Sequence, residues 1–227
     1  MSGVPEQLPL TVAGRAPPSL DNFLGAANAE VRARLRALVG SSGGRIWLTG
    51  GTGSGKSHLL SATSLAARAA QRTVLDNAAT AAALRAAIDG HVEIVLLDDA
   101  DAIAGVTELE ALLMQLCNEQ AGALVLAGRL HPAAAAWQLP DLRSRLLAAE
   151  VFRLAPLDDA DRRELLVGRA ADVGLELEDD VLAYLLSRLP RDSANLLASM
   201  NRLDLASWRA QRRLTVPFVR DVLALNR

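Results

Sequence analysis

The chain has 227 residues, of which 51% are hydrophobic and only 3% aromatic, and this composition favours helices over an all-β sandwich or barrel. Its 24 basic and 26 acidic residues nearly cancel, which argues against direct DNA binding through a global positive field. The single cysteine, Cys117, excludes an internal disulfide framework and a cysteine-rich zinc site, and we expect it to pack in a protein core.

Residues 1–19 contain four prolines and few large apolar residues, which predicts a tail without regular structure. Within this tail, Gln7–Val12 alternates apolar side chains along a proline-stiffened peptide, a form suited to docking in a groove. From composition alone, an ordinary tail that folds back on the body is the favoured interpretation. The chain shows neither a secretory signal nor an apolar run of membrane-spanning length, so we expect a soluble, cytoplasmic protein without membrane association.

An amphipathic helix is expected from Asn28 and ends in the Ser- and Gly-rich residues 41–44. A short buried strand at 45–49 then runs into a glycine-rich turn that matches the phosphate-binding pattern G-x-x-x-x-G-K-[ST]. The residues expected to bind nucleotide are Gly50, Gly51, Thr52, Gly53, Ser54, Gly55, Lys56, Ser57 and His58. Lys56 is expected to reach the β- and γ-phosphates and the Ser57 hydroxyl to bind Mg²⁺, whereas His58 is not expected to be catalytic.

Further short strands are predicted at 73–75, 93–97, 123–127 and 151–154, with helices at 57–68, 78–88 and 109–116 between them. This alternation predicts a parallel sheet covered by helices on both faces. After Pro156 the pattern predicts helices only, at 158–172, 178–189 and 192–211, with a last one opened by Pro217. We therefore divide the chain into a tail (1–19), an α/β base domain (20–156) and a helical lid domain (157–227).

Two adjacent carboxylates follow the third predicted strand. Asp98 is expected to hold the metal ion, because a carboxylate at the end of a neighbouring buried strand lies close to a phosphate loop. Asp99 is placed to polarise water, although its side chain is one methylene shorter than the glutamate that would position a nucleophile. Asp101 is interpreted as a solvated residue at a helix start.

These features together resemble the AAA+ ATPases, and within them the DnaA-related family, most closely its short Hda group of regulatory inactivators. The resemblance covers residues 7–225 and includes a strand leading to Gly128 and an arginine near the end of the base. Segments 19–23, 139–146 and 210–219 support it, and the second and third are specific to this group. The implied fold is a P-loop AAA+ base with a five-stranded parallel sheet sandwiched by helices, followed by a small all-α lid.

The resemblance also implies a function in the control of chromosomal replication. The implied ligands are ADP or ATP with Mg²⁺, and the implied partners are DnaA, the DNA polymerase III beta sliding clamp and further copies of the chain in a homodimer or higher assembly, with DNA met only through the clamp. Arg145 matches the family's arginine finger and would act in trans on ATP bound to DnaA. The clamp-binding peptide would consist of Gln7, Leu8, Pro9, Leu10 and Val12.

Two departures from the family pattern concern ATP turnover by this chain itself. The sensor position on the fourth strand falls near Ala127 to Arg129, and the lid arginine position falls at Ala194, with Arg191 one turn away. An autonomous ATPase of the helicase-loader type is the alternative, supported by the intact loop and weakened by both alanines. A DNA-binding initiator paralogue is weakened by the near-neutral charge and by a chain too short for a further DNA-binding domain.

Overall fold

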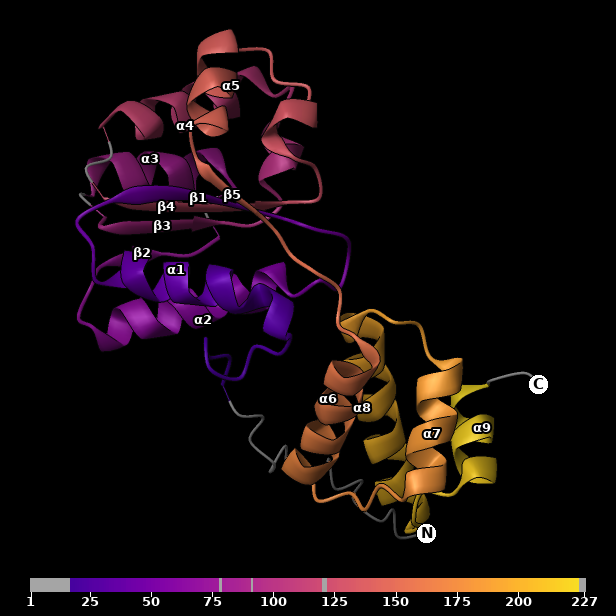
Figure 1. Ribbon diagram of the computed structural model, residues 1–227. Helices are drawn as coiled ribbons and strands as arrows, with labels where there is room; N and C mark the ends of the chain where they lie inside the picture. The colour runs from indigo at the N-terminus through magenta and orange to yellow at the C-terminus, as the bar shows by residue number, and fades with distance from the viewer. Residues whose placement is uncertain (1–16, 78, 91, 120–121, 225–227) are drawn as a thin grey trace, which may run out of the picture.

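The computed structural model describes residues 17–77, 79–90, 92–119 and 122–224. Its base contains a five-stranded parallel sheet, as the sequence predicts, and the strands lie in the order β2-β3-β4-β1-β5 (Figure 1). The strands are β1 (Gly44–Thr49), β2 (Val74–Leu75), β3 (Ile94–Leu97), β4 (Ala123–Gly128) and β5 (Glu150–Arg153). Strand β1 lies between β4 and β5, so the loop that follows it is flanked by the carboxyl ends of two parallel strands.

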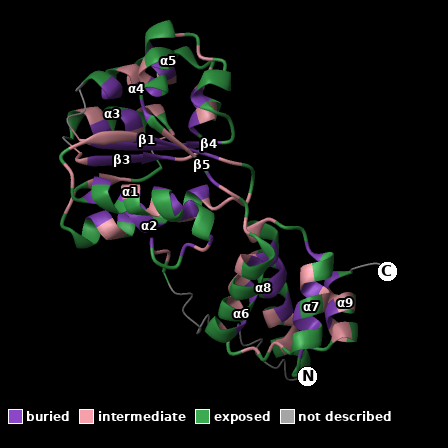
Figure 2. Ribbon diagram, in the orientation of Figure 1, coloured by how far each residue is buried: buried purple, intermediate pink, exposed green. Residues whose placement is uncertain are grey.

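The sheet is covered on both faces because its central strands carry apolar side chains on both sides. Ile46 and Leu48 of β1 pack with α1 (Ala29–Val39) and α2 (Lys56–Ala69), whereas Trp47 packs on the opposite face. The helices on that opposite face are α3 (Ala81–Asp89), α4 (Thr107–Glu119) and α5 (Pro140–Leu147). Figure 2 shows the resulting buried sheet between helices whose outer faces are exposed.

Short 3₁₀ helices complete the base: η1 (Ala26–Asn28), η2 (Ala100–Ile103) and η3 (Pro132–Ala134). Helix α3 begins at Ala81, later than predicted, because the Thr80 hydroxyl accepts a hydrogen bond from Ala83 N and caps the helix there. Cys117 is only 1% exposed, and burial raises the pKa of its thiol, which confirms the packing role expected from the sequence.

Four helices form the C-terminal lid: α6 (Asp159–Asp172), α7 (Asp179–Arg188), α8 (Ser193–Ala210) and α9 (Val216–Leu223). They enclose a separate core that includes Leu166, Leu185 and Met200, all fully buried. Their starts follow the polar residues of the sequence: Asp158 forms a capping box with Asp161, and Thr215 caps α9 ahead of Pro217. None of the described helices is long and apolar enough to cross a membrane.

Candidate nucleotide-binding site

The glycine-rich loop joins β1 to α2, and its glycines meet both conformational and steric demands. Gly53 has φ 74° and Gly55 has φ 92°, in the left-handed region that favours glycine. A Cβ at Gly53 would lie 2.7 Å from Asp192 Oδ1, and one at Gly55 would overlap the Phe23 ring. Gly55 precedes α2, so the unpaired N–H groups of the first helical turn face the space above the loop. The loop is therefore shaped to receive a phosphate.

Lys56 lies against the backbone of this loop. Its Nζ donates hydrogen bonds to the carbonyl oxygens of Gly50 at 2.7 Å and Gly51 at 2.9 Å, and the residue is only 8% exposed. Burial lowers the pKa of Lys56, and the nearby carboxylates, Asp98 first among them, oppose this effect. A phosphate oxygen would replace the carbonyls as a stronger, charged acceptor for this ammonium group.

The two residues predicted to bind Mg²⁺ are in direct contact. Ser57 Oγ donates a hydrogen bond of 2.5 Å to Asp98 Oδ2, so the start of α2 meets the end of β3. The second oxygen, Asp98 Oδ1, accepts from Asp99 N at 2.9 Å. A hydroxyl and a carboxylate in contact beside a phosphate loop form the type of oxygen donor set that Mg²⁺ uses with substrate phosphates. The residues present therefore fit the ion.

The two other carboxylates after β3 differ in their surroundings. Asp99 is exposed and has a left-handed backbone conformation, φ 48° and ψ 39°, which is a strained conformation for a residue other than glycine. Asp101 lies in the first turn of η2, but the expectation of a merely solvated side chain is wrong. Its Oδ2 accepts hydrogen bonds from Arg129 N and Leu130 N, both at 3.0 Å, and so fixes the backbone just beyond β4.

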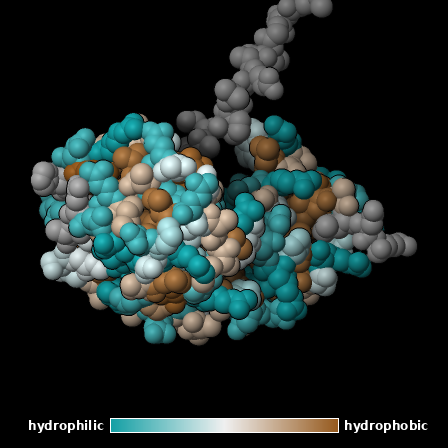
Figure 3. All heavy atoms as spheres, turned by 90° about the horizontal axis from the view of Figure 1, so that it is seen from above, coloured by the Kyte–Doolittle hydropathy of each residue, from teal (hydrophilic) through white to brown (hydrophobic). Residues whose placement is uncertain are grey.

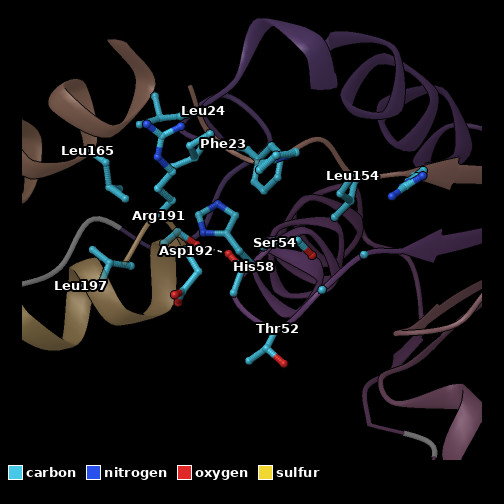
Figure 4. A pocket seen from close by; sticks show the side chains of 18 of the residues that line it. Phe23, Leu24, Thr52, Ser54, His58, Leu154, Leu165, Arg191, Asp192 and Leu197 are labelled. Atoms are coloured by element: carbon cyan, nitrogen blue, oxygen red, sulfur yellow. Dashed lines mark hydrogen bonds between the residues drawn. The ribbon is translucent and has the colours of Figure 1, made fainter. Parts of the chain in front are cut away.

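A cavity of about 1070 Å³ extends from the loop to the lid (Figure 4). Its apolar lining comes from both domains, with Phe23 and Leu154 from the base and Leu165 and Leu197 from the lid. Its basic lining consists of Arg129, His131, Arg153, Arg169 and Arg191, with His58 near the loop. An apolar region adjoining a phosphate loop and several cations suits a nucleotide, whose base is flat and whose phosphates are anionic.

His58 holds the segment that covers one side of the cavity. Its Nε2 lies 3.0 Å from Asn22 Oδ1 and 3.3 Å from Ser19 O, and its ring centroid lies 5.5 Å from that of Phe23. Because Phe23 also packs on Gly55, residues 19–23 are fixed against the loop. His58 thus lines the cavity while anchoring its wall, and the role of Phe23 was missed from the sequence.

The lid touches the loop directly. Ser193 donates to Gly53 O from its backbone N at 3.3 Å and from its hydroxyl at 2.5 Å. Asp192 caps α8 by accepting from Asn195 N at 2.9 Å; burial raises the pKa of this carboxyl, but the hydrogen bonds from Asn195 outweigh it and the net pKa is lowered. No local pattern indicates the contacts of Ser193 with Gly53, since they join residues far apart in the chain.

Ala127 and Ala194, the alanines at the two expected sensor positions, have no polar side chain to act on phosphate. Ala127 is fully buried in β4, and Ala194 is an exposed residue in the first turn of α8. Arg191 does line the cavity, but it lies 3.6 Å from Asp159 Oδ1 in an ion pair and is 75% exposed. Arg129 is the first polar residue after β4, and its charge is close enough to lower the pKa of Lys56.

Arg145 lies on α5, away from the residues that line the cavity. It is half-buried on the side of Cys117, whose pKa its charge helps to lower against the larger effect of burial. It makes no ion pair with another described residue. Arg143, two residues earlier on α5, donates to Ala133 O at 3.3 Å. The predicted clamp-binding residues Gln7, Leu8, Pro9, Leu10 and Val12 lie outside the described residues.

Comparison with known proteins gives a family for the lid and structural relatives for the whole chain. Residues 159–223 match the family model described as "Hda, lid domain". An uncharacterized protein of Haemophilus influenzae is 33% identical over 232 residues, covering 97% of this chain and 99% of the relative.

The solved structures that share the fold include two of DnaA. Domain III of the Thermotoga maritima replication initiation protein DnaA superposes with a TM-score of 0.78 at 19% identity, over 91% of this chain and 95% of that one. The replication initiator DnaA bound to AMPPCP and single-stranded DNA superposes with a TM-score of 0.71 at 21% identity, over 86% and 68% of the two chains.

Proposed function

Because the chain belongs to the Hda-like group of DnaA-related AAA+ proteins, we propose that it regulates the initiation of chromosomal replication by stimulating hydrolysis of DnaA-bound ATP. The observation that carries this proposal is a phosphate loop with its Ser57–Asp98 pair intact in a chain that has alanines at both sensor positions. Such a chain is equipped to hold a nucleotide and poorly equipped to hydrolyse it. Its nucleotide then serves to stabilise an active conformation.

In this proposal the cavity binds ADP or ATP. The loop N–H groups and Lys56 bind the phosphates, and the base lies against the apolar side chains near Phe23 and Leu165. Ser57 and Asp98 would hold Mg²⁺, which neutralises phosphate charge when bound. Ser193 and Asp192 close the lid over the loop, so nucleotide occupancy and lid closure are linked.

Arg145 is the group that would act on DnaA. Its guanidinium is permanently cationic, it forms no ion pair with another described residue, and it lies on a helix outside the chain's own cavity. An arginine presented to a neighbouring subunit can stabilise the charge that develops on the γ-phosphate oxygens as the phosphate bond breaks. The reaction itself would take place in the nucleotide site of DnaA.

The tail would bring the two proteins together on DNA. We propose that Gln7, Leu8, Pro9, Leu10 and Val12 dock on the DNA polymerase III beta sliding clamp, so that contact with DNA is indirect. This part of the proposal rests on the resemblance of the tail peptide to clamp-binding segments. A protein bound to the clamp would act in the cytoplasm, at the replisome. Because AAA+ proteins of this kind pair through the side that carries the arginine finger, we also propose a homodimer or a larger assembly.

The test is ATP hydrolysis by purified DnaA with DNA-loaded clamp, with and without this protein. We expect hydrolysis to rise only when all components are present, and Arg145→Ala to lose the stimulation while it retains nucleotide. Arg143→Ala is the matched control, since it removes a cation from the same helix without touching the proposed finger. Full stimulation by Arg145→Ala contradicts the finger assignment.

The intact loop also favours a second candidate function, an autonomous ATPase of the helicase-loader type. This function requires hydrolysis by the protein alone that is abolished in Lys56→Ala. Equal hydrolysis with and without DnaA would support this candidate and refute the regulatory proposal.

A further inference from the structure

Glu110 is a carboxylate buried in α4 and surrounded by backbone donors. The residue is 0% exposed, and its oxygens accept hydrogen bonds from three amides. Gly105 N donates to Oε1 at 2.7 Å, Gln138 N lies 3.0 Å from each oxygen, and Leu139 N donates to Oε2 at 2.9 Å. The hydrogen bonds outweigh the burial that would otherwise raise the pKa of Glu110, and its net pKa is lowered. The group is therefore held as an anion.

The amides that Glu110 binds belong to two functional segments. Gly105 follows the Asp98–Asp99 pair and η2, whereas Gln138 and Leu139 immediately precede α5. The side chain of Gln138 joins the same two segments. Its Nε2 donates to Gly105 O at 3.0 Å, and its Oε1 accepts from the Thr107 hydroxyl at 3.0 Å. The turn after β3 and the start of α5 are thereby joined through one carboxylate.

Glu110 also places a negative charge beside the start of α5, which has no side-chain cap. Leu139 is the capping residue of α5 and has no polar side chain, and Pro140 has no N–H to donate. A negative charge beside the first turn of a helix is favourable because of the helix dipole. The direction in which α5 leaves the loop is consequently set by where Glu110 holds residues 138 and 139.

From this geometry we infer that Glu110 is a positioning residue for Arg145, one and a half turns along α5. The inference rests on the proposed function of Arg145 as an arginine finger. A carboxylate offers only acceptors to the three amides, whereas an amide at the same place would direct its NH₂ group at some of them. Glu110→Gln should therefore release residues 138 and 139 and shift α5 with little change in side-chain volume.

The main experiment measures DnaA ATP hydrolysis at increasing concentrations of wild type, Glu110→Gln and Glu108→Gln. Glu108 lies on the same helix but is exposed and contacts Arg85, so Glu108→Gln removes the same charge without touching α5. We expect Glu110→Gln to lower the maximal stimulated rate by roughly 10- to 100-fold, because small misplacements of a catalytic group have effects of this size. Its affinity for nucleotide and the concentration for half-maximal stimulation should stay near wild type, as should all values for Glu108→Gln.

Amide hydrogen exchange separates this inference from the proposed function. Glu110→Gln should exchange faster than wild type over residues 136–147 and equally over 44–60, which contain the phosphate loop. If wild type stimulates no hydrolysis, the proposed function fails, and the exchange pattern alone decides whether Glu110 positions α5. Should Glu110→Gln fail to fold, Gln138→Ala, which removes the side-chain contacts to Gly105 and Thr107, is measured in both assays. Unchanged exchange over 136–147, or full stimulation by a folded variant, overturns the inference.

Discussion

Ser57 Oγ and Asp98 Oδ2 lie 2.5 Å apart, so the first turn of α2 and the end of β3 meet where a metal ion beside the phosphates would be expected. Asp98→Asn should therefore weaken nucleotide binding by ~10-fold in Mg²⁺, because a neutral amide is a poorer ligand for a hard cation than a carboxylate. The same variant should bind as wild type in excess EDTA. Titration calorimetry in both conditions measures this, with Asp221→Asn on α9 as the control. Equal weakening with and without Mg²⁺ would exclude a metal role for Asp98.

Two glycines of the phosphate loop should differ in how much an alanine substitution lowers the free energy of unfolding. Gly53→Ala should lower the free energy of unfolding by about 1 to 2 kcal/mol, because φ of 74° is unfavourable for alanine and the new Cβ would approach Asp192. A Cβ at Gly51 meets nothing within 4 Å, so Gly51→Ala should stay within about 0.5 kcal/mol of wild type. Urea unfolding without nucleotide gives both values, and equal losses at the two positions would contradict the expected difference between Gly53 and Gly51.

Lowering the pH should remove the contribution of the Glu110 carboxylate to the free energy of unfolding. The pKa of Glu110 in the folded chain lies below the ordinary glutamate value of 4.5, so its stabilisation is complete above that value and is lost as pH falls through the folded pKa. At about pH 7, the free energy of unfolding of Glu110→Gln should be lower than that of wild type by about 1.5 to 3 kcal/mol, the range for hydrogen bonds to a charged group. The difference should shrink as the pH is lowered from about 5 towards 3. A constant difference over this range would show that Glu110 does not act as an anion.

The sequence predicted those features that are specified locally. The alternation of Ile46, Trp47 and Leu48 with both faces buried, and the pattern from Gly50 to Ser57, determined the sheet and the loop without knowledge of distant residues. Helix starts in the lid were likewise predictable from their capping residues.

Contacts between distant segments were not predictable. Asp101 was interpreted as a solvated residue because nothing in its neighbourhood indicates that Arg129 N and Leu130 N come within 3.0 Å of it. The contacts of Phe23 with Gly55 and of Ser193 with Gly53 depend equally on how the segments pack, which a motif does not encode. On the face shown in Figure 3, hydrophilic and hydrophobic side chains are interspersed, and composition alone does not place a site there.

The order of the strands also determines when the phosphate loop can form during synthesis. The two partners of β1 are β4 and β5, so one of its edges stays open until the ribosome has released the chain as far as Gly128, and the other until it has released Arg153. Such pairings between distant segments fold slowly, because a long loop must close before any contact is gained. A fragment that stops short of Arg153 would leave one edge of β1 unpaired next to hydrophobic surface and would be prone to aggregate. Although it is translated early, the nucleotide site is thus completed only after most of the base has emerged.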